Sequence, residues 1–350
     1  MRRFMITAVA ALVLVQSAPA AAQEVDWRVS VAGGADSLGG FQDVGASGPR
    51  DAWVVRTGLP LLRWNGSAWR PVKGTAVPYL VSSYSPGELW RFHESTEKVD
   101  VVRWNGKEWS RLPIAAEGAH ATAAVVPGRG ECWAAGIQFG ERGMTDVLWH
   151  WQGNGWHTVP TPLPISDFAA ASRKDVWALS SMGYGGERVA SIMRWNGGAW
   201  RKEATPVLAQ RSRLGDAYAE LSDIVALSRD DVFAVGAITT IEGENRSVRE
   251  AIVMHWDGQT WRRLPHRPLE TGYKRVASDG AGGLWLVTER QGRSDVLTHY
   301  TGPGKWAQVT VGTARLEITG LTNVPGTTQM WATAEARGPG AARQLVLSHQ

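Results

Sequence analysis

The sequence is 350 residues long, with 37 Lys and Arg against 33 Asp and Glu and a formal charge of +4. Because this excess is small and the basic residues are scattered, the composition excludes a nucleic-acid-binding protein. Cys132 is the single cysteine, which excludes an intramolecular disulfide, so a packed core has to stabilise the fold. We expect a monomer that needs no cofactor.

The chain begins with the features of a secretory signal peptide. Two arginines follow the first Met, and the apolar stretch at residues 4–15 is too short to cross a bilayer. Ala20 and Ala22 then fit the small-x-small rule for cleavage. The pattern predicts that residues 1–22 are removed and that residues 23–350 are exported without stable membrane insertion. An uncleaved membrane anchor is the alternative.

The rest of the chain repeats one unit, and residues 228–264 are its clearest copy. In that copy a strand with an aromatic residue, Phe233, precedes a W-x-x-x-x-W pair around Asp257-Gly258. The pairs are Trp64/Trp69, Trp104/Trp109, Trp151/Trp156, Trp195/Trp200 and Trp256/Trp261, with Tyr300/Trp306 as a degraded copy. The upstream aromatics are Trp53, Trp90, Trp133, Trp177, Phe233, Trp285 and Trp331, spaced 37 to 56 residues apart. This period is typical of an all-β fold, the β-propeller.

Each unit predicts four short antiparallel strands. The first strand holds small residues, as at 121–124 and 169–172, and the second contains the upstream aromatic. The third ends on the first Trp of the pair, and an Asn-Gly or Asp-Gly turn leads into the fourth. Because the gap between neighbouring blades widens away from the axis, outer strands need large side chains. We therefore interpret the Trp pairs and upstream aromatics as structural; Trp149 lies outside this pattern.

The repeat count predicts seven blades in a closed ring. Six complete units run from about residue 38 to 309, and a seventh, at 316–350, lacks its fourth strand. Residues 26–31, around Trp27, match the fourth-strand pattern that follows the Trp pairs at Trp69 and Trp261. We predict that this N-terminal strand completes the last blade, which removes the free edges of an open array.

These units resemble secreted bacterial propellers of the broad kelch and galactose-oxidase-like group, at the level of architecture. Kelch units close their second strand with a Gly-Gly doublet, whereas only Gly136 and Gly236 stand in that region here. The copper site of galactose oxidase needs a cysteine joined to a tyrosine, but Cys132 directly precedes Trp133 in a packing position. The resemblance implies the fold, and no functional residue is carried over from it.

Strand direction separates the two ends of the propeller. The stereotyped turns between strands 1 and 2 and between strands 3 and 4 share one end, here the short-turn face. The 2–3 and 4–1 loops share the other end, here the variable-loop face, and the longest are residues 203–220 and 236–250. Loops on a rigid scaffold commonly carry function. The predicted ligand-binding residues on this face are Arg91, His93, His120, Tyr184, Arg213, Tyr218, Arg246, Tyr273, Lys274 and Arg315.

The sequence contains no metal-ligand cluster, nucleophile elbow or phosphate loop. The leading hypothesis is a non-enzymatic binding or scaffold propeller that recognises a protein or a cell-surface glycan. The alternative is an extracellular carbohydrate hydrolase or lyase with converging carboxylates at the top of the channel; the candidates are Asp43, Asp167, Glu220 and Glu317. A redox or metal-dependent propeller is a third hypothesis. A tight carboxylate or His cluster with shifted pKa values would favour the enzyme.

Overall fold

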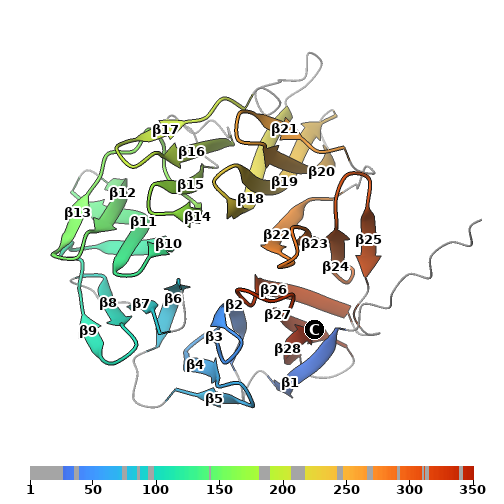
Figure 1. The fold of residues 1–350 in the computed structure, drawn as a ribbon, viewed down its shortest axis with the longest axis horizontal. Helices are drawn as coiled ribbons and strands as arrows, with labels where there is room; N and C mark the ends of the chain where they lie inside the picture. Colours follow the sequence, from blue (N-terminus) through green and yellow to red (C-terminus); the bar gives the residue numbers. More distant parts are fainter. Residues whose placement is uncertain are drawn as a thin grey trace, which may run out of the picture.

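A computed structural model describes residues 27–350 apart from 35–38, 73–76, 85–86, 94–97, 142, 181–189, 206–216, 243–246, 266–270, 290–291, 310, 312–314 and 339–341. These residues form seven four-stranded antiparallel sheets arranged as blades around a common axis (Figure 1). The inner strands of such a ring line a central channel. This confirms the predicted seven-bladed β-propeller. No helix that is long and apolar enough to cross a membrane occurs in these described ranges.

The blades follow the chain from the axis outward. Blade 1 is β2 (Phe41–Gly48), β3 (Asp51–Arg56), β4 (Leu59–Trp64) and β5 (Trp69–Pro71). Blade 2 is β6 (Pro78–Ser83), β7 (Leu89–His93), β8 (Asp100–Trp104) and β9 (Trp109–Arg111). Blade 3 is β10 (Ala119–Gly128), β11 (Glu131–Gly140), β12 (Gly143–Trp151) and β13 (Trp156–Thr158). Blade 4 is β14 (Asp167–Ser172), β15 (Asp175–Ser180), β16 (Ser191–Trp195) and β17 (Trp200–Lys202).

The remaining blades complete the circle. Blade 5 is β18 (Ala217–Ser228), β19 (Asp231–Ile241), β20 (Ser247–Trp256) and β21 (Trp261–Arg263). Blade 6 is β22 (Tyr273–Ser278), β23 (Leu284–Thr288), β24 (Val296–Tyr300) and β25 (Trp306–Val309). Blade 7 is β26 (Arg315–Asn323), β27 (Met330–Arg337), β28 (Arg343–His349) and, from the N-terminal end, β1 (Arg28–Gly34).

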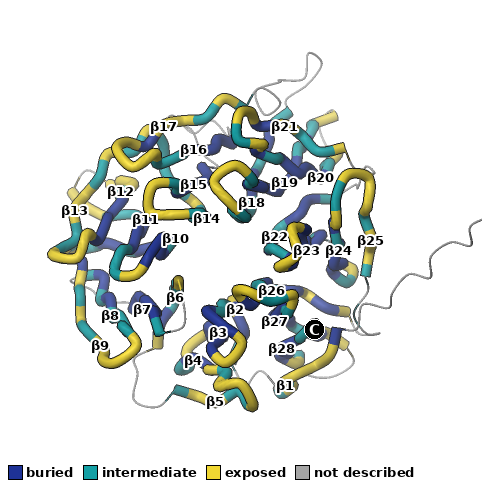
Figure 2. The backbone as a smooth tube through the Cα atoms, in the orientation of Figure 1, coloured by how far each residue is buried: buried dark blue, intermediate teal, exposed yellow. Residues whose placement is uncertain are grey.

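The core lies between blades, where aromatic side chains fill the widening gaps. The second strands of blades 1, 2 and 6 are buried throughout, and those of the other blades are buried around their aromatic residue, whereas the described turns are mostly exposed (Figure 2). At the interface of blades 4 and 5, Trp177 lies 5.3 Å from Trp256 and 5.5 Å from Trp261, measured between ring centroids. Trp149, the tryptophan outside the repeat pattern, is also buried in a core cluster, between blades 2 and 3. Its position explains it as a packing residue.

In blades 1, 2, 4 and 5 one side chain holds the turn between strands 3 and 4. The Asn65 Oδ1 atom accepts hydrogen bonds from the backbone N–H groups of Ser67 and Ala68, and Asn105, Asn196 and Asp257 repeat this arrangement. The paired tryptophans face each other across four turn residues, and the glycine after the Asn or Asp has a positive φ, as at Gly66 with 95°. Among the described residues positive φ is confined to glycines.

A second repeated contact, which the sequence analysis did not predict, ties the short-turn face together. In six blades an acid at the start of the second strand, or in the turn before it as with Glu88 and Asp279, pairs with an Arg or His from the third strand. That cation or imidazole lies over the second-strand aromatic. The sets are Asp51–Arg63–Trp53, Glu88–Arg103–Trp90, Glu131–His150–Trp133, Asp175–Arg194–Trp177, Asp231–His255–Phe233 and Asp279–His299–Trp285. Each of these six blades thus carries a polar clamp beside its hydrophobic core.

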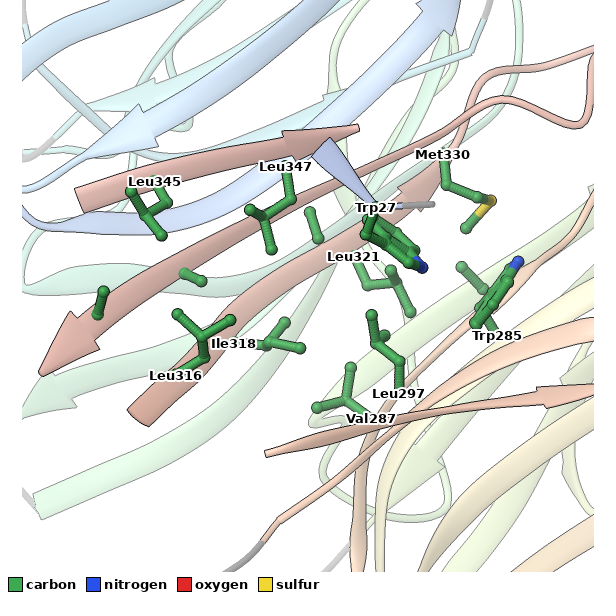
Figure 3. Packing of buried hydrophobic residues seen from close by; sticks show 14 residues of the cluster. Trp27, Trp285, Val287, Leu297, Leu316, Ile318, Leu321, Met330, Leu345 and Leu347 are labelled. Carbon is green, nitrogen blue, oxygen red and sulfur yellow. The ribbon is translucent and has the colours of Figure 1, made fainter. Parts of the chain in front are cut away.

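The N-terminal strand closes the ring as predicted. Strand β1 pairs antiparallel with β28, from Arg28 opposite Ser348 to Gly34 opposite Arg343. Just before β1, the Trp27 side chain is buried between blades 6 and 7, edge-on to Trp285 at 5.6 Å (Figure 3). The chain therefore holds its two ends together by hydrogen bonds and by a shared core.

Candidate functional site

One residue from each inner strand occupies an equivalent position in the wall of the channel. In every blade this residue pairs with the second-strand residue that lies two positions after the aromatic. Four blades place a charged or ionisable residue there: Asp43, Asp167, Asp223 and Arg275. The other three have Leu80, Ala123 and Gly320. We call these seven positions the channel layer.

Asp43 lies in a niche that a glycine in the neighbouring blade creates. A Cβ atom on Gly320 would lie 2.7 Å from the Asp43 Oδ1 atom and 2.7 Å from the backbone nitrogen of Val44. The same Oδ1 atom accepts a hydrogen bond from that nitrogen at 2.8 Å. This hydrogen bond fixes one carboxylate oxygen, and because Asp43 is exposed, solvent can still reach the residue.

Asp167 and Asp223 form a carboxyl–carboxylate pair across the interface of blades 4 and 5. The two side chains hydrogen-bond each other. Asp223 also accepts backbone hydrogen bonds from Ile224 at 2.8 Å and from Val276 of blade 6 at 2.9 Å. Because Asp223 accepts two N–H groups, it is the ionised partner and Asp167 carries the shared proton.

The protein environment raises the pKa of all three carboxyl groups. Poor solvation inside the ring is the main cause and raises the pKa of Asp43 to about 6, with Arg275 acting in the opposite direction. Burial likewise raises the pKa of Asp167, and the Asp223 charge and hydrogen bond raise it further. Burial also raises the pKa of Asp223, against the lowering effects of Arg275 and Val276. Asp43 is water-accessible yet surrounded by protein, which is why an exposed group has a raised pKa.

The arrangement limits the chemistry available to the layer. Glycoside hydrolysis needs two carboxyl groups about 5–9.5 Å apart on either side of the bond. Asp167 and Asp223 are in hydrogen-bond contact, about 2.5–3 Å for such a pair, so no sugar bond fits between them. No three His, Cys, Asp or Glu side chains in the described parts of the chain are placed to share a metal ion. Asp43 remains as the accessible acid.

Two hairpins extend past the channel layer on the variable-loop face. The β11–β12 hairpin ends with Phe139 opposite Met144, and each is 58% exposed. The β19–β20 hairpin carries Ile241 and Val248 near its end, and both are also exposed. These hairpins belong to blades 3 and 5, so apolar tips stand on either side of blade 4.

The structure describes seven of the ten predicted ligand-binding residues. Tyr184, Arg213 and Arg246 lie outside the described residues. Tyr273 is buried in a core cluster, which raises its pKa to about 12. Arg91 and His93 are also buried, in β7.

The other predicted residues are at least partly accessible. His120 in β10 stacks on Tyr79 of β6 at 4.4 Å, and Tyr218 is half-buried in β18. Lys274 pairs with Asp295 at 2.7 Å, and Arg315 is exposed at the start of β26. The seven described residues are thus divided between the core and accessible positions, and a ligand role for these four stays a prediction.

Of the four carboxylates proposed for a catalytic site, the channel layer contains two, Asp43 and Asp167. Glu220 instead pairs with Arg249 at 3.7 Å, and Glu317 with Arg337 at 2.9 Å. The sequence analysis missed Asp223 and Arg275. A signal for them exists, because the channel-layer residue lies ten positions before the second-strand aromatic in the first six blades and eleven in the seventh.

The comparisons with known proteins agree with this architecture. No protein-family model and no curated protein matches the sequence. A structure of YCF48 bound to D1 peptide is similar with a TM-score of 0.55 and 15% identity, over 95% of this chain and 99% of that one. The GH74 xyloglucanase from Xanthomonas campestris gives 0.57 and 14%, over 89% of this chain and 53% of that one. The RRP9 WD40 repeats give 0.54 and 12%, over 92% and 97%. At these identities the likeness shows the propeller fold.

Proposed function

We propose that this protein is an exported binding propeller that holds a segment of a protein partner over its variable-loop face, with a Lys or Arg side chain reaching Asp43. The observation that carries this proposal is the excess of acid in the channel layer, where three carboxyl groups face one guanidinium among the described residues. A ligand cation would favour the ionised form of Asp43 and offset its poor solvation. Asp167 and Asp223 are already hydrogen-bonded to each other, so Asp43 is the carboxylate of the channel layer that can contact a ligand.

The rim of the channel supplies the second part of the proposed contact. The exposed apolar residues of the β11–β12 and β19–β20 hairpins could pack against apolar side chains of the same segment. YCF48, one of the structural neighbours, was determined with a bound peptide, which supports a peptide as the ligand class for a propeller of this size. A neutral glycan would contact the apolar rim but would offer no cation to Asp43, so the acid favours a protein segment as the ligand.

Substitution of Asp43 with Asn tests this proposal. A library of short random peptides is selected on the mature protein at pH 7.5, and we expect enrichment of peptides with a central Lys or Arg. Asp43→Asn should bind the selected peptides about tenfold more weakly, the effect of one charge-assisted hydrogen bond. Because only the ionised carboxylate attracts a cation, wild-type affinity should fall as the pH drops through about 6.

Glu317→Gln is the matched control, because it removes an exposed acid that pairs with Arg337 on the same side of the ring. It should bind the selected peptides like the wild type. Equal binding by Asp43→Asn, or selected peptides without Lys or Arg enrichment, would contradict the proposal.

The hydrolase alternative is favoured by one observation, the raised pKa of Asp43, which suits a general acid near neutral pH. A panel of soluble polysaccharides assayed for new reducing ends tests it. Sugar release by the wild type that is lost in both Asp43→Asn and Asp167→Asn would replace the binding proposal with a catalytic one. We expect no release above the level of the Asp43→Asn variant.

Export is the remaining part of the proposal, and it follows from residues 1–22, which lie outside the described residues. Intact mass spectrometry of protein recovered from a secreting host should show a chain that begins at Gln23. The strand that follows, β1, starts at Arg28, so cleavage at that site leaves the closing strand intact. A full-length product retained in the membrane fraction would contradict export.

A further inference from the structure

The interface between blades 1 and 2 differs from the other six. At each of the others the second-strand aromatic of one blade contacts an aromatic ring from the outer strands of the next, as Trp90 contacts Trp151 and Trp156. Trp53 of blade 1 has no such ring contact with Trp104 or Trp109 among the described residues, and its core cluster is the smallest of the seven. We call this interface the open seam.

Arg91 lies in the open seam, where its guanidinium group is buried. It sits on β7 two positions after Leu89, which packs against Trp53, so both side chains face blade 1. Arg91 is 3% exposed, yet its Nε and Nη1 atoms have no hydrogen-bond partner in the described structure. Burial lowers its pKa to about 10, so it remains charged at neutral pH. Buried charges are ordinarily paired with an opposite charge.

Trp109 and His93 are neighbours of this charge, and Asp100, which pairs with Arg111, lies opposite His93 on β8. The Arg91 guanidinium carbon lies 3.7 Å from the ring centroid of Trp109, and that indole is 41% exposed on the outermost strand. His93, on the same face of β7, is buried, and its Nδ1 atom also has no partner among the described residues. Burial, with the nearby Arg91 charge, lowers the pKa of His93, so no second cation competes for an anion.

We propose that the open seam binds a ligand carrying a carboxylate, which pairs with the Arg91 guanidinium while the apolar part of the ligand lies against Trp109. A single monovalent cation within apolar surroundings matches a monovalent carboxylate, whereas a phosphate dianion would keep an uncompensated charge. The site lies outside the channel and does not depend on the proposed function. Access requires the Trp109 indole to swing outward from β9, a strand of three residues at the outer edge of its blade.

Two probes that differ only in charge test this site. We use 3-phenylpropionate and 3-phenylpropionamide, titrated into the mature protein with ¹⁵N-labelled indoles. The signal that disappears in Trp109→Phe identifies Trp109, and this signal should shift with the carboxylate. The carboxylate should bind about tenfold more tightly than the amide, the effect of one charge-assisted pair. Inorganic phosphate should bind no more tightly than the amide.

Arg91→Met should abolish the preference for the carboxylate, because Met fills similar space without the charge. Arg111→Met is the matched control: Arg111 lies two residues from Trp109, and its side chain is 70% exposed in an ion pair with Asp100. That variant should keep the preference. In the absence of ligand, Arg91→Met should melt at or above the wild-type temperature, since it removes an unpaired buried charge.

Four results would overturn the proposal. The wild type could bind both probes equally or bind neither, a result that does not depend on any variant folding. The preference could persist in Arg91→Met, which would place the carboxylate elsewhere. A lower melting temperature for ligand-free Arg91→Met would show that Arg91 serves the packing of the seam. Phosphate binding as tight as the carboxylate would contradict the assigned ligand class.

Discussion

Replacement of Trp27 with alanine is expected to lower the free energy of unfolding by about 3–5 kcal/mol, the range for truncating a buried aromatic side chain. Trp27 is 8% exposed, and its indole packs edge-on against Trp285 and lies 5.6 Å from the His349 ring. The side chain therefore joins the closing strand to both blades beside it. Urea denaturation of a protein that comprises residues 23–350 measures the change.

The control for this prediction is Val29→Ala, two residues along the same segment. Val29 is 55% exposed on β1, so its truncation should change the free energy of unfolding by less than about 0.5 kcal/mol. Deletion of residues 23–31 should be more harmful, because it removes most of β1 and leaves β28 as an open edge that promotes aggregation. An unchanged denaturation midpoint for Trp27→Ala would show that the ring is not stabilised by this closure.

The fold could be predicted because its determinants are local and repeated. The W-x-x-x-x-W pairs fix the hairpin between strands 3 and 4. The seventh unit lacks a fourth strand, and the N-terminal segment has the pattern of a fourth strand but belongs to no other unit. Both features are read from spacing alone. The glycines that seemed to depart from the kelch pattern have a local cause as well. A Cβ atom on Gly136 would lie 2.1 Å from the His120 carbonyl oxygen, and one on Gly236 would lie 1.9 Å from that of Glu220.

The candidate site could be predicted only in part, because it depends on register. Each inner strand except β14 has an irregularity beside the channel layer, such as the shift between Leu221 and Asp223 in β18. One extra residue moves the following side chain to the position opposite Val235. Counting residues from the start of each inner strand therefore selects Glu220 and overlooks Asp223. Arg91 could not be interpreted from the sequence either, because its lack of a partner is a property of the folded interface.

The clamps on the short-turn face also escaped the sequence analysis, although they too have a spacing signal. The acid lies two residues before the aromatic in the first five blades, and the Arg or His directly precedes the first residue of the aromatic pair. In blade 6 the acid, Asp279, lies six residues before Trp285 instead. Blade 7 places Ser348 opposite Trp331 and has no acid–base pair there among its described residues. Its closure depends on the Trp27 core.

Substitution of Glu88 with alanine should cost about 3–5 kcal/mol, because it removes one partner of a buried ion pair. The Glu88 side chain is 0% exposed and accepts hydrogen bonds from Arg103 Nε at 2.8 Å and Nη2 at 3.1 Å. It also accepts from the Trp90 indole at 3.0 Å and from the Gly130 backbone of blade 3 at 3.2 Å. Alanine would leave these donors without their acceptor, including a guanidinium charge on a side chain that is only 21% exposed.

Chemical denaturation of Glu88→Ala beside Glu317→Ala isolates the effect of burial. Glu317 also pairs with an arginine, at 2.9 Å, but both side chains of that pair are about half exposed, so its loss should cost no more than about 1 kcal/mol. Glu88→Gln should fall between the two, because the amide oxygen can still accept a hydrogen bond but carries no charge for Arg103. Equal small losses for Glu88→Ala and Glu317→Ala would mean that water replaces the missing carboxylate. The clamp would then contribute to the shape of the turn and little to the stability of the ring.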